Sequence, residues 1–240
     1  MDQGNYPTCT AFESVATKEA TDGVAYSPEY FTLKEGEKMG WRGEPWEGCD
    51  LRVKMQVGVD SGFLPKNIAP VTFSQGIDLV LSSNNWDEQN LDPIAKKNAY
   101  KSYWTVHAYN GMDLFDSMRS TLWNIKGDKM SVCAGLMFYE SWLHNPIMGA
   151  KPLNAIGLHD IKVAGWKKID GDPYLVLQNS FGTQYGDNGL FYMSRPVANK
   201  FLNQGAYYWS KDDPPPDVKA IGLLITLYER LLDLFRKLRT

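Results

Sequence analysis

Residues 173–195 read PYLVLQNSFGTQYGDNGLFYMSR. Two runs of strand-forming residues, Tyr174–Gln178 and Gly189–Ser194, flank a loop rich in Gly, Asn and Asp, which is typical of two strands joined by a long turn. Residues 158–166, LHDIKVAGW, have the same character, and Asp170–Pro173 favours a turn before the next strand. The sequence therefore predicts a series of three strands in this part of the chain.

The pattern changes towards the N-terminus. Apolar residues recur at helical spacing in Thr8–Ala20, and Asp50–Val59 predicts a second helix, whereas Pro65–Asn98 is rich in Asn, Asp and Pro and predicts irregular structure. The remaining expected elements are strands at 102–108 and 130–139 and a helix at 112–125. Helices in the first half and strands in the second predict an α+β fold of two lobes rather than a doubly wound sheet.

The composition describes a folded chain. Of its 240 residues, 43% are hydrophobic and 13% aromatic, which suits a sizeable core and excludes general disorder. The net charge of −3 argues against a dedicated nucleic-acid binder, which usually presents a basic face. No apolar run approaches the roughly 20 residues that cross a bilayer, and MDQGNYPTCTAF lacks the features of a secretory signal. We therefore expect cytoplasmic synthesis without a membrane span.

Three cysteines, Cys9, Cys49 and Cys133, cannot all pair, and none lies in a CxxC motif. We expect no disulfide framework, no metal and no cofactor. Cys133 is flanked by small apolar residues and is predicted to lie in the core. Cys9 is expected at or near a helix N-terminus, where partial positive charge and free N–H groups favour a thiolate. A thiol nucleophile also needs a base, and the candidates are His107, His144 and His159.

Several stretches resemble the papain family of cysteine peptidases. DQGNYPTCTAF has a glutamine six residues before its cysteine, LHDIKVAGW resembles the family's histidine-bearing strand, and NSFGTQYGDNG resembles its Asn-Ser-Trp-Gly block. SPEY at Ser27–Tyr30 and the residues of Gly48–Phe63 resemble the left lobe. Cys9 precedes His159 by 150 positions and Asn179 by 170, as in the family. The resemblance covers about residues 1–210.

This resemblance implies a papain-like two-lobe fold with a helical left lobe and a β-barrel-like right lobe, of the type that bacteria or bacteriophages have without a propeptide. It implies that Cys9 attacks the scissile carbonyl as a thiolate, that His159 moves the proton, and that Asn179 orients the imidazole. Gln3 would donate to the oxyanion together with the backbone N–H of Cys9. The positions expected to contact substrate are Gly48, Cys49, Phe181 and Trp46.

The sequence departs from the family pattern at four positions. Thr10 replaces the aromatic residue after the nucleophile, and Phe181 replaces the tryptophan that shields the histidine–asparagine hydrogen bond. Asp160 follows the histidine where the family prefers a small apolar residue, and its carboxylate would raise the imidazole pKa or point away from it. Tyr6 replaces a cysteine that forms a disulfide in secreted members, consistent with an unpaired Cys49.

The expected peptidase domain spans residues 1–211, with the left lobe at about 1–98 and the right lobe at about 99–211. A Pro-rich linker at 212–217 follows. Residues 218–240 carry apolar side chains at alternating spacings of three and four, which predicts an amphipathic helix.

The predicted C-terminal helix leaves two interpretations open. With Asp217 it holds five basic and three acidic residues, a net charge of +2 within a chain of net charge −3. Its apolar face would dock on the parent domain or on a second copy. Alternatively, its basic residues would hold it on an anionic membrane surface or a larger assembly such as a virion.

Three functional hypotheses follow. The first is a cysteine endopeptidase acting on protein or peptide substrates, with no nucleic-acid partner. The second is a weak or inactive papain-fold subunit with a binding or structural role, attached through its C-terminal helix. The third is a hydrolase of peptide cross-links in a cell wall.

Overall fold

The computed structural model describes residues 2–4, 6–41, 48–106, 113–123 and 132–209, together with the single residues Leu227 and Leu231. The α-helices are α1 (Cys9–Asp22), α2 (Pro28–Met39), α3 (Leu51–Asp60), α4 (Ile77–Val80), α5 (Glu88–Lys96), α6 (Leu114–Trp123) and α7 (Arg195–Phe201). The strands are β1 (Ser102–Val106), β2 (Val132–Tyr139), β3 (Ala155–Ile169), β4 (Asp172–Gln178), β5 (Leu190–Ser194) and β6 (Leu202–Trp209). Short 3₁₀ turns cover Lys66–Ile68, Phe73–Gln75, Ser83–Asn85 and Glu140–Trp142.

The ends of the first three helices follow local capping rules. The Ser27 side chain accepts from the N–H of Tyr30 at the start of α2, and Asp50 caps α3 in the same way. α1 ends at Gly23, whose φ of 71° is the left-handed conformation that glycine adopts most readily. These signals fix where each helix begins or ends.

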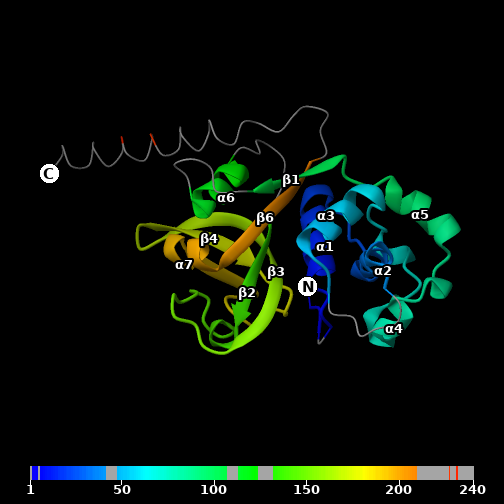
Figure 1. Cartoon of the computed structure of the whole chain (residues 1–240), viewed down its shortest axis with the longest axis horizontal. Helices are drawn as coiled ribbons and strands as arrows, with labels where there is room; N and C mark the ends of the chain where they lie inside the picture. The colour runs from blue at the N-terminus through cyan, green and yellow to red at the C-terminus, as the bar shows by residue number, and fades with distance from the viewer. Residues whose placement is uncertain are drawn as a thin grey trace.

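The strands form one sheet in the order β1-β6-β2-β3-β4-β5, and every neighbouring pair is antiparallel. α6 and α7 cover one face of this sheet, while α1 and α3 pack on the other (Figure 1). Consecutive strand residues point to opposite faces, so Ala134 belongs to the first of these cores and Cys133 to the second. The sheet with α6 and α7 is the right lobe.

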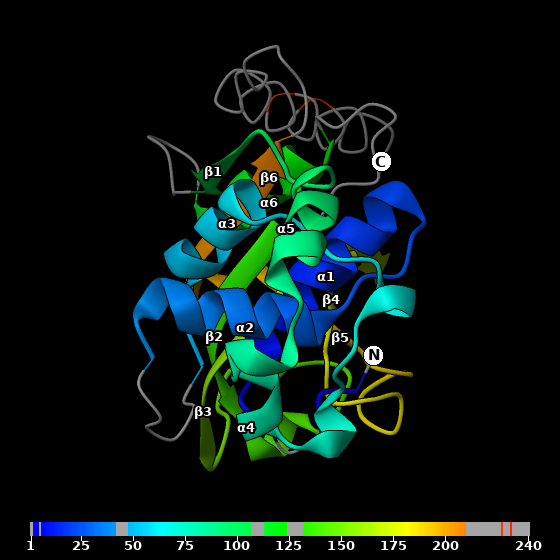
Figure 2. The same cartoon turned by 90° about the vertical axis from the view of Figure 1, so that its right-hand side faces the viewer.

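The left lobe consists of α1 to α5, which lie together at one side of the sheet in Figure 1 and in front of it in Figure 2. Its own apolar core includes Tyr30 and Leu33 of α2, Trp86, and Ala95 of α5. α1 packs against α2, α3 and β3, and therefore lies where the two lobes meet. The mixed helical and antiparallel architecture confirms the predicted α+β fold.

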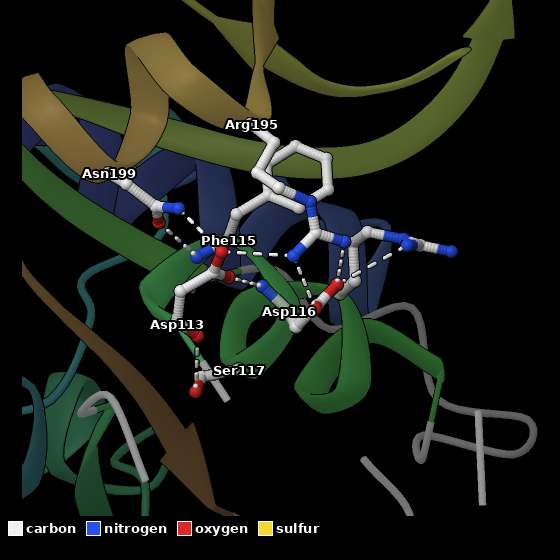
Figure 3. Close-up of polar contacts among 7 residues, drawn as sticks. Asp113, Phe115, Asp116, Ser117, Arg195 and Asn199 are labelled. Carbon is white, nitrogen blue, oxygen red and sulfur yellow. Dashed lines mark hydrogen bonds and ion pairs between the residues drawn. The ribbon is translucent and has the colours of Figure 1, made fainter. Parts of the chain in front are cut away.

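A polar cluster fastens α7 to the start of α6 (Figure 3). The Arg195 guanidinium donates to Asp113 over 2.9 Å and to Asp116 over 2.7 Å. The backbone N–H of Phe115 donates to the Asn199 side chain over 3.1 Å. Because the Arg195 guanidinium also lies 5.0 Å from the centre of the Phe115 ring, it joins the polar cluster to the right-lobe core.

Four regions differ from the sequence prediction, and two of them are the helices α2 and α7, which were not predicted. Residues 65–98 are not irregular: they include α4 and α5, because burial of Val80, Trp86 and Ala95 in the left-lobe core outweighs weak local propensity. β6 was not predicted, and it pairs with β1 and β2, which are distant in sequence.

The predicted linker and C-terminal helix, residues 212–240, lie outside the described residues apart from Leu227 and Leu231. Within the described ranges, the helices are too short or too polar to cross a membrane.

The contact between α3 and β6 gives a stability prediction. Replacing Gly58 by Ala would place a Cβ 2.5 Å from the ring of Tyr208, a buried side chain stacked on Tyr100 at 4.3 Å. Helix propensity alone favours Ala by about 1 kcal/mol, but overpacking a core costs about 1–3 kcal/mol. We expect G58A to lower the free energy of unfolding in urea titrations. The control G149A meets open space, and equal stability of both variants would contradict the packing.

Candidate active site

A cleft of about 760 Å³ lies between the two lobes. It is lined by segments far apart in sequence, namely the start of α1, residues 48–51, β3 and the segment after β4. Six of the predicted site residues line it: Gln3, Cys9, Gly48, Cys49, His159 and Phe181. Asn179 is linked to the cleft through its hydrogen bond with His159. The predicted contact residue Trp46 falls in 42–47, outside the described residues.

Cys9 is the first residue of α1 and is partly exposed to the cleft. The first backbone N–H groups of a helix have no partner within it, so the helix end presents donors and partial positive charge near this residue. The backbone N–H of Asp160 donates to the Cys9 sulfur. Burial nevertheless raises the pKa of Cys9 to about 12, with a smaller contribution from the Asp160 carboxylate.

His159 is oriented by a chain of hydrogen bonds. Its Nε2 lies 2.9 Å from Asn179 Oδ1, and the same oxygen accepts from the backbone N–H of Ser180 over 2.7 Å. Because Ser180 supplies an N–H, the Asn179 atom facing it must be the carbonyl oxygen, which only accepts. The proton of neutral His159 is therefore on Nε2, and Nδ1 remains the basic atom.

Phe181 covers the imidazole. The two rings stack with centroids 4.5 Å apart and planes inclined by 29°, and Phe138 meets the histidine edge-on at 5.4 Å. His159 is 6% exposed. Burial lowers its pKa to about 4, outweighing the Asn179 hydrogen bond and the Asp160 carboxylate, which raise it.

Gln3 is held against the segment that carries Asn179. Its backbone N–H donates to the Ser180 carbonyl over 2.8 Å, and its side-chain oxygen accepts from the Ser180 hydroxyl. The side-chain nitrogen donates one hydrogen to the Tyr6 carbonyl over 2.9 Å. An amide nitrogen carries two hydrogens, so the second is available in the cleft.

Cys49 shares the cleft with Cys9 but has a different environment. Its thiol hydrogen-bonds to Glu35, a buried side chain of α2 that also accepts from the Thr10 hydroxyl over 3.1 Å. Burial and the Glu35 charge raise the pKa of Cys49 strongly. All three cysteines lie within the described residues and are free thiols, and Cys133 is fully buried as predicted.

The Asp160 carboxylate pairs with Lys54 of α3 over 3.0 Å, and its charge acts to raise the pKa of His159, as one of the two sequence expectations had it. Lys54 also pairs with Glu13, which lies on α1 one turn after Cys9. Sequence analysis missed these two partners and Ser180. The available signal was a charged residue, Glu13, between the apolar residues of the helix predicted at Thr8–Ala20.

The sequence also matches known proteases. The family model described as "Papain family cysteine protease" matches residues 53–208, more than half of the chain. The matched range contains His159 and Asn179 and begins after Cys9. The chain therefore belongs to the papain family of cysteine proteases.

Individual relatives support this assignment. The chain is 25% identical over 223 residues to "Cathepsin B-like CP2" of Giardia intestinalis, a match covering 86% of this chain and 67% of that protein. A 66-residue match to "Cathepsin B-like cysteine proteinase 1" of Ostertagia ostertagi is 38% identical and covers 27% of this chain. That match spans 19% of the Ostertagia protein, so the chain covers a minor part of it.

Solved structures share the fold. Xylellain, a cysteine protease from Xylella fastidiosa, superposes with a TM-score of 0.70 at 16% identity, over 88% of this chain and 82% of that one. The Carica candamarcensis protease CMS1MS2 gives a TM-score of 0.62 at 17% identity, over 88% and 92% of the two chains. At these identities the likeness establishes the papain-like fold.

The burial of His159 predicts its titration. We expect its Cε1–H NMR signal to titrate near pH 4 rather than near 6.5. The unfolded chain binds this proton at the higher pH, so the contribution of His159 to the free energy of unfolding falls as the pH drops from 6.5 to 4. Replacing Phe181 by Ala should move the midpoint upwards because it hydrates the ring. A wild-type midpoint at or above 6.5 would contradict this burial.

Proposed function

We propose that this protein is a cysteine peptidase in which Cys9 is the nucleophile, His159 the base and Asn179 the residue that orients it. One observation carries the proposal: the Asn179 hydrogen bond leaves Nδ1 of His159 as the proton acceptor in the cleft that Cys9 enters from a helix N-terminus. Membership of the papain family agrees with this reaction class.

The proposed reaction proceeds in two stages. Cys9 sulfur bonds to the scissile carbonyl carbon while its proton passes to Nδ1 of His159, giving a tetrahedral oxyanion and an imidazolium. The imidazolium then gives its proton to the leaving amine as the C–N bond breaks, which leaves a thioester on Cys9. Water, deprotonated by His159, attacks the thioester, and the acid product and the thiol are released.

The oxyanion would be stabilised by two donors from this chain. One is the second N–H of the Gln3 side chain, and the other is the backbone N–H of Cys9, the first residue of α1. Ser180 fixes Gln3 through both its backbone and its side chain, so the donor is held before substrate arrives. Donors fixed in advance stabilise the transition state without a cost of reorganisation.

The cleft favours a peptide with apolar side chains over a cell-wall fragment. Three apolar side chains that line it are exposed, Met39 by 50%, Ile156 by 53% and Leu158 by 75%. Exposed apolar side chains gathered at a cleft are typical of a binding surface. Cell-wall peptides and their sugars are rich in polar and charged groups. They would therefore offer these three side chains little apolar surface to pack against.

Replacing Cys9 by Ala tests the proposal. With a fluorogenic peptide library, we expect kcat/KM to fall at least about 10⁴-fold, because the proposed acyl-enzyme forms on the Cys9 sulfur. E64, an inhibitor bound in the structure of the Ananas comosus protease bromelain, should label the wild type and not this variant. The matched control is Cys133→Ala, which removes a buried thiol outside the cleft. Hydrolysis that survives in C9A would disprove the nucleophile, and an inactive, unlabelled wild type would favour a binding role.

Replacing Gln3 by Ala tests the oxyanion donor. We expect kcat to fall about 10²–10³-fold with little change in KM, because the interaction forms in the transition state. Gln184→Ala serves as control, since the Gln184 amide also donates to a backbone carbonyl but is exposed outside the cleft. Equal kcat values for the two variants would exclude Gln3 from this role.

A further inference from the structure

Lys54, Glu13 and Asp160 form a charged cluster beneath the cleft, called here the buried triad. The Lys54 ammonium pairs with Glu13 of α1 and, over 3.0 Å, with Asp160 of β3. The exposed fractions of the three side chains are 0%, 2% and 10%. Two helices, α1 and α3, and the strand β3 therefore meet at one buried cation.

Burying three charged side chains costs free energy, so the triad is a poor means of stabilising the fold alone. Burial opposes the charge of Lys54, but the negative groups around it, Asp160 foremost, raise its pKa well above the ordinary value, so it stays charged. Apolar side chains of similar volume often stabilise a core as well as or better than a buried ion pair. The role of the triad is therefore better judged from where its charges lie than from its contribution to stability.

The two carboxylates lie on the two segments that carry the proposed nucleophile and base. Glu13 follows Cys9 by one turn of α1, and Asp160 directly follows His159 on β3. Asp160 also donates its backbone N–H to the Cys9 sulfur. A cation that holds both carboxylates consequently fixes the start of α1, which carries Cys9, against the part of β3 that carries His159.

We propose that Lys54 is a positioning residue for the Cys9–His159 pair: its ammonium sets the spacing of α1 and β3 and offsets the Asp160 charge beside the sulfur. This inference rests on the proposed function. It assigns to a residue outside the cleft an effect on both the geometry and the reactivity of the thiol.

The charged groups around the Cys9 thiol differ in their effect on its pKa. Asp160 is the carboxylate that raises the pKa of Cys9 most, and Lys54 lowers it. Burial raises the pKa of Glu13 itself, with Lys54 as the main opposing influence, and the carboxylates that raise the pKa of Cys9 are Asp160 and Glu35. The titratable groups that act on the thiol are Asp160 from β3, Lys54 from α3 and Glu35 from α2. His159 lines the same cleft, and Glu13 lies on the helix of Cys9 and pairs with Lys54.

Two isosteric variants separate positioning from bulk stability. Asp160→Asn and Glu13→Gln each remove one carboxylate and leave Lys54 paired with the other, so both are expected to fold. We expect both to lower kcat about tenfold at unchanged KM, because each loosens one link between α1 and β3. Lys54→Met removes both links, but it leaves two buried carboxylates and is the variant most prone to unfold.

The thiol itself provides a readout that needs no substrate. Its reaction with a dipyridyl disulfide at pH 7.5, followed by mass spectrometry of the Cys9 peptide, should be about threefold faster in D160N. Removing the Asp160 charge lowers the pKa of Cys9 and so raises the thiolate fraction, and the accompanying loss of nucleophilicity offsets part of that gain. In E13Q the rate should stay near that of the wild type.

These results distinguish the inference from its alternatives. Wild-type kcat in both variants, or equal changes in their thiol rates, would overturn it, even if both variants melt at lower temperature as a merely structural pair predicts. If the wild type shows no Cys9-dependent hydrolysis, the proposed function fails, while the thiol rates still decide whether the triad controls the sulfur.

Discussion

The structure depends on the burial of α1 between the helices of the left lobe and the sheet of the right lobe. Every side chain from Thr10 to Lys18 is buried, so this helix has no solvent-facing side over its first three turns. Its N-terminus consequently cannot move without disturbing both lobes. This constraint holds Cys9 at the edge of the cleft and places a helix end, with its free N–H groups, beneath the reacting atoms.

Burial of a helix on all sides requires a partner for each polar side chain that it carries. Lys18 pairs with Asp22 over 3.0 Å and lies 4.3 Å from the centre of the Tyr100 ring. Glu13 accepts from Thr17 over 3.2 Å and pairs with Lys54. Near the cleft, Lys54 joins α1 of the left lobe to β3 of the right lobe through its pairs with Glu13 and Asp160.

The sequence predicted the parts of the site that depend on local patterns. Local patterns predicted that Cys9 lies at a helix start, His159 on a strand and Asn179 after a strand, whereas their catalytic roles come from the resemblance to the papain family. β6 and the helices within 65–98 were missed because they are stabilised by contacts with distant segments rather than by their own propensity. Lys54 belongs to the same class, because its partners on α1 and β3 are brought together only by the fold.

The electrostatics of the cleft explain why several weak donors are needed around one sulfur. Burial favours the neutral forms of both Cys9 and His159, so neither charge of an ion pair is stable alone. A thiolate and an imidazolium that form in the same cleft have opposite charges, so forming both together costs less than forming either one alone. The α1 N-terminus and the Asp160 N–H stabilise the anion, while the Asn179 oxygen stabilises the cation. Phe181 keeps water from replacing these contacts, and the charges therefore depend on fixed groups of the protein rather than on solvent.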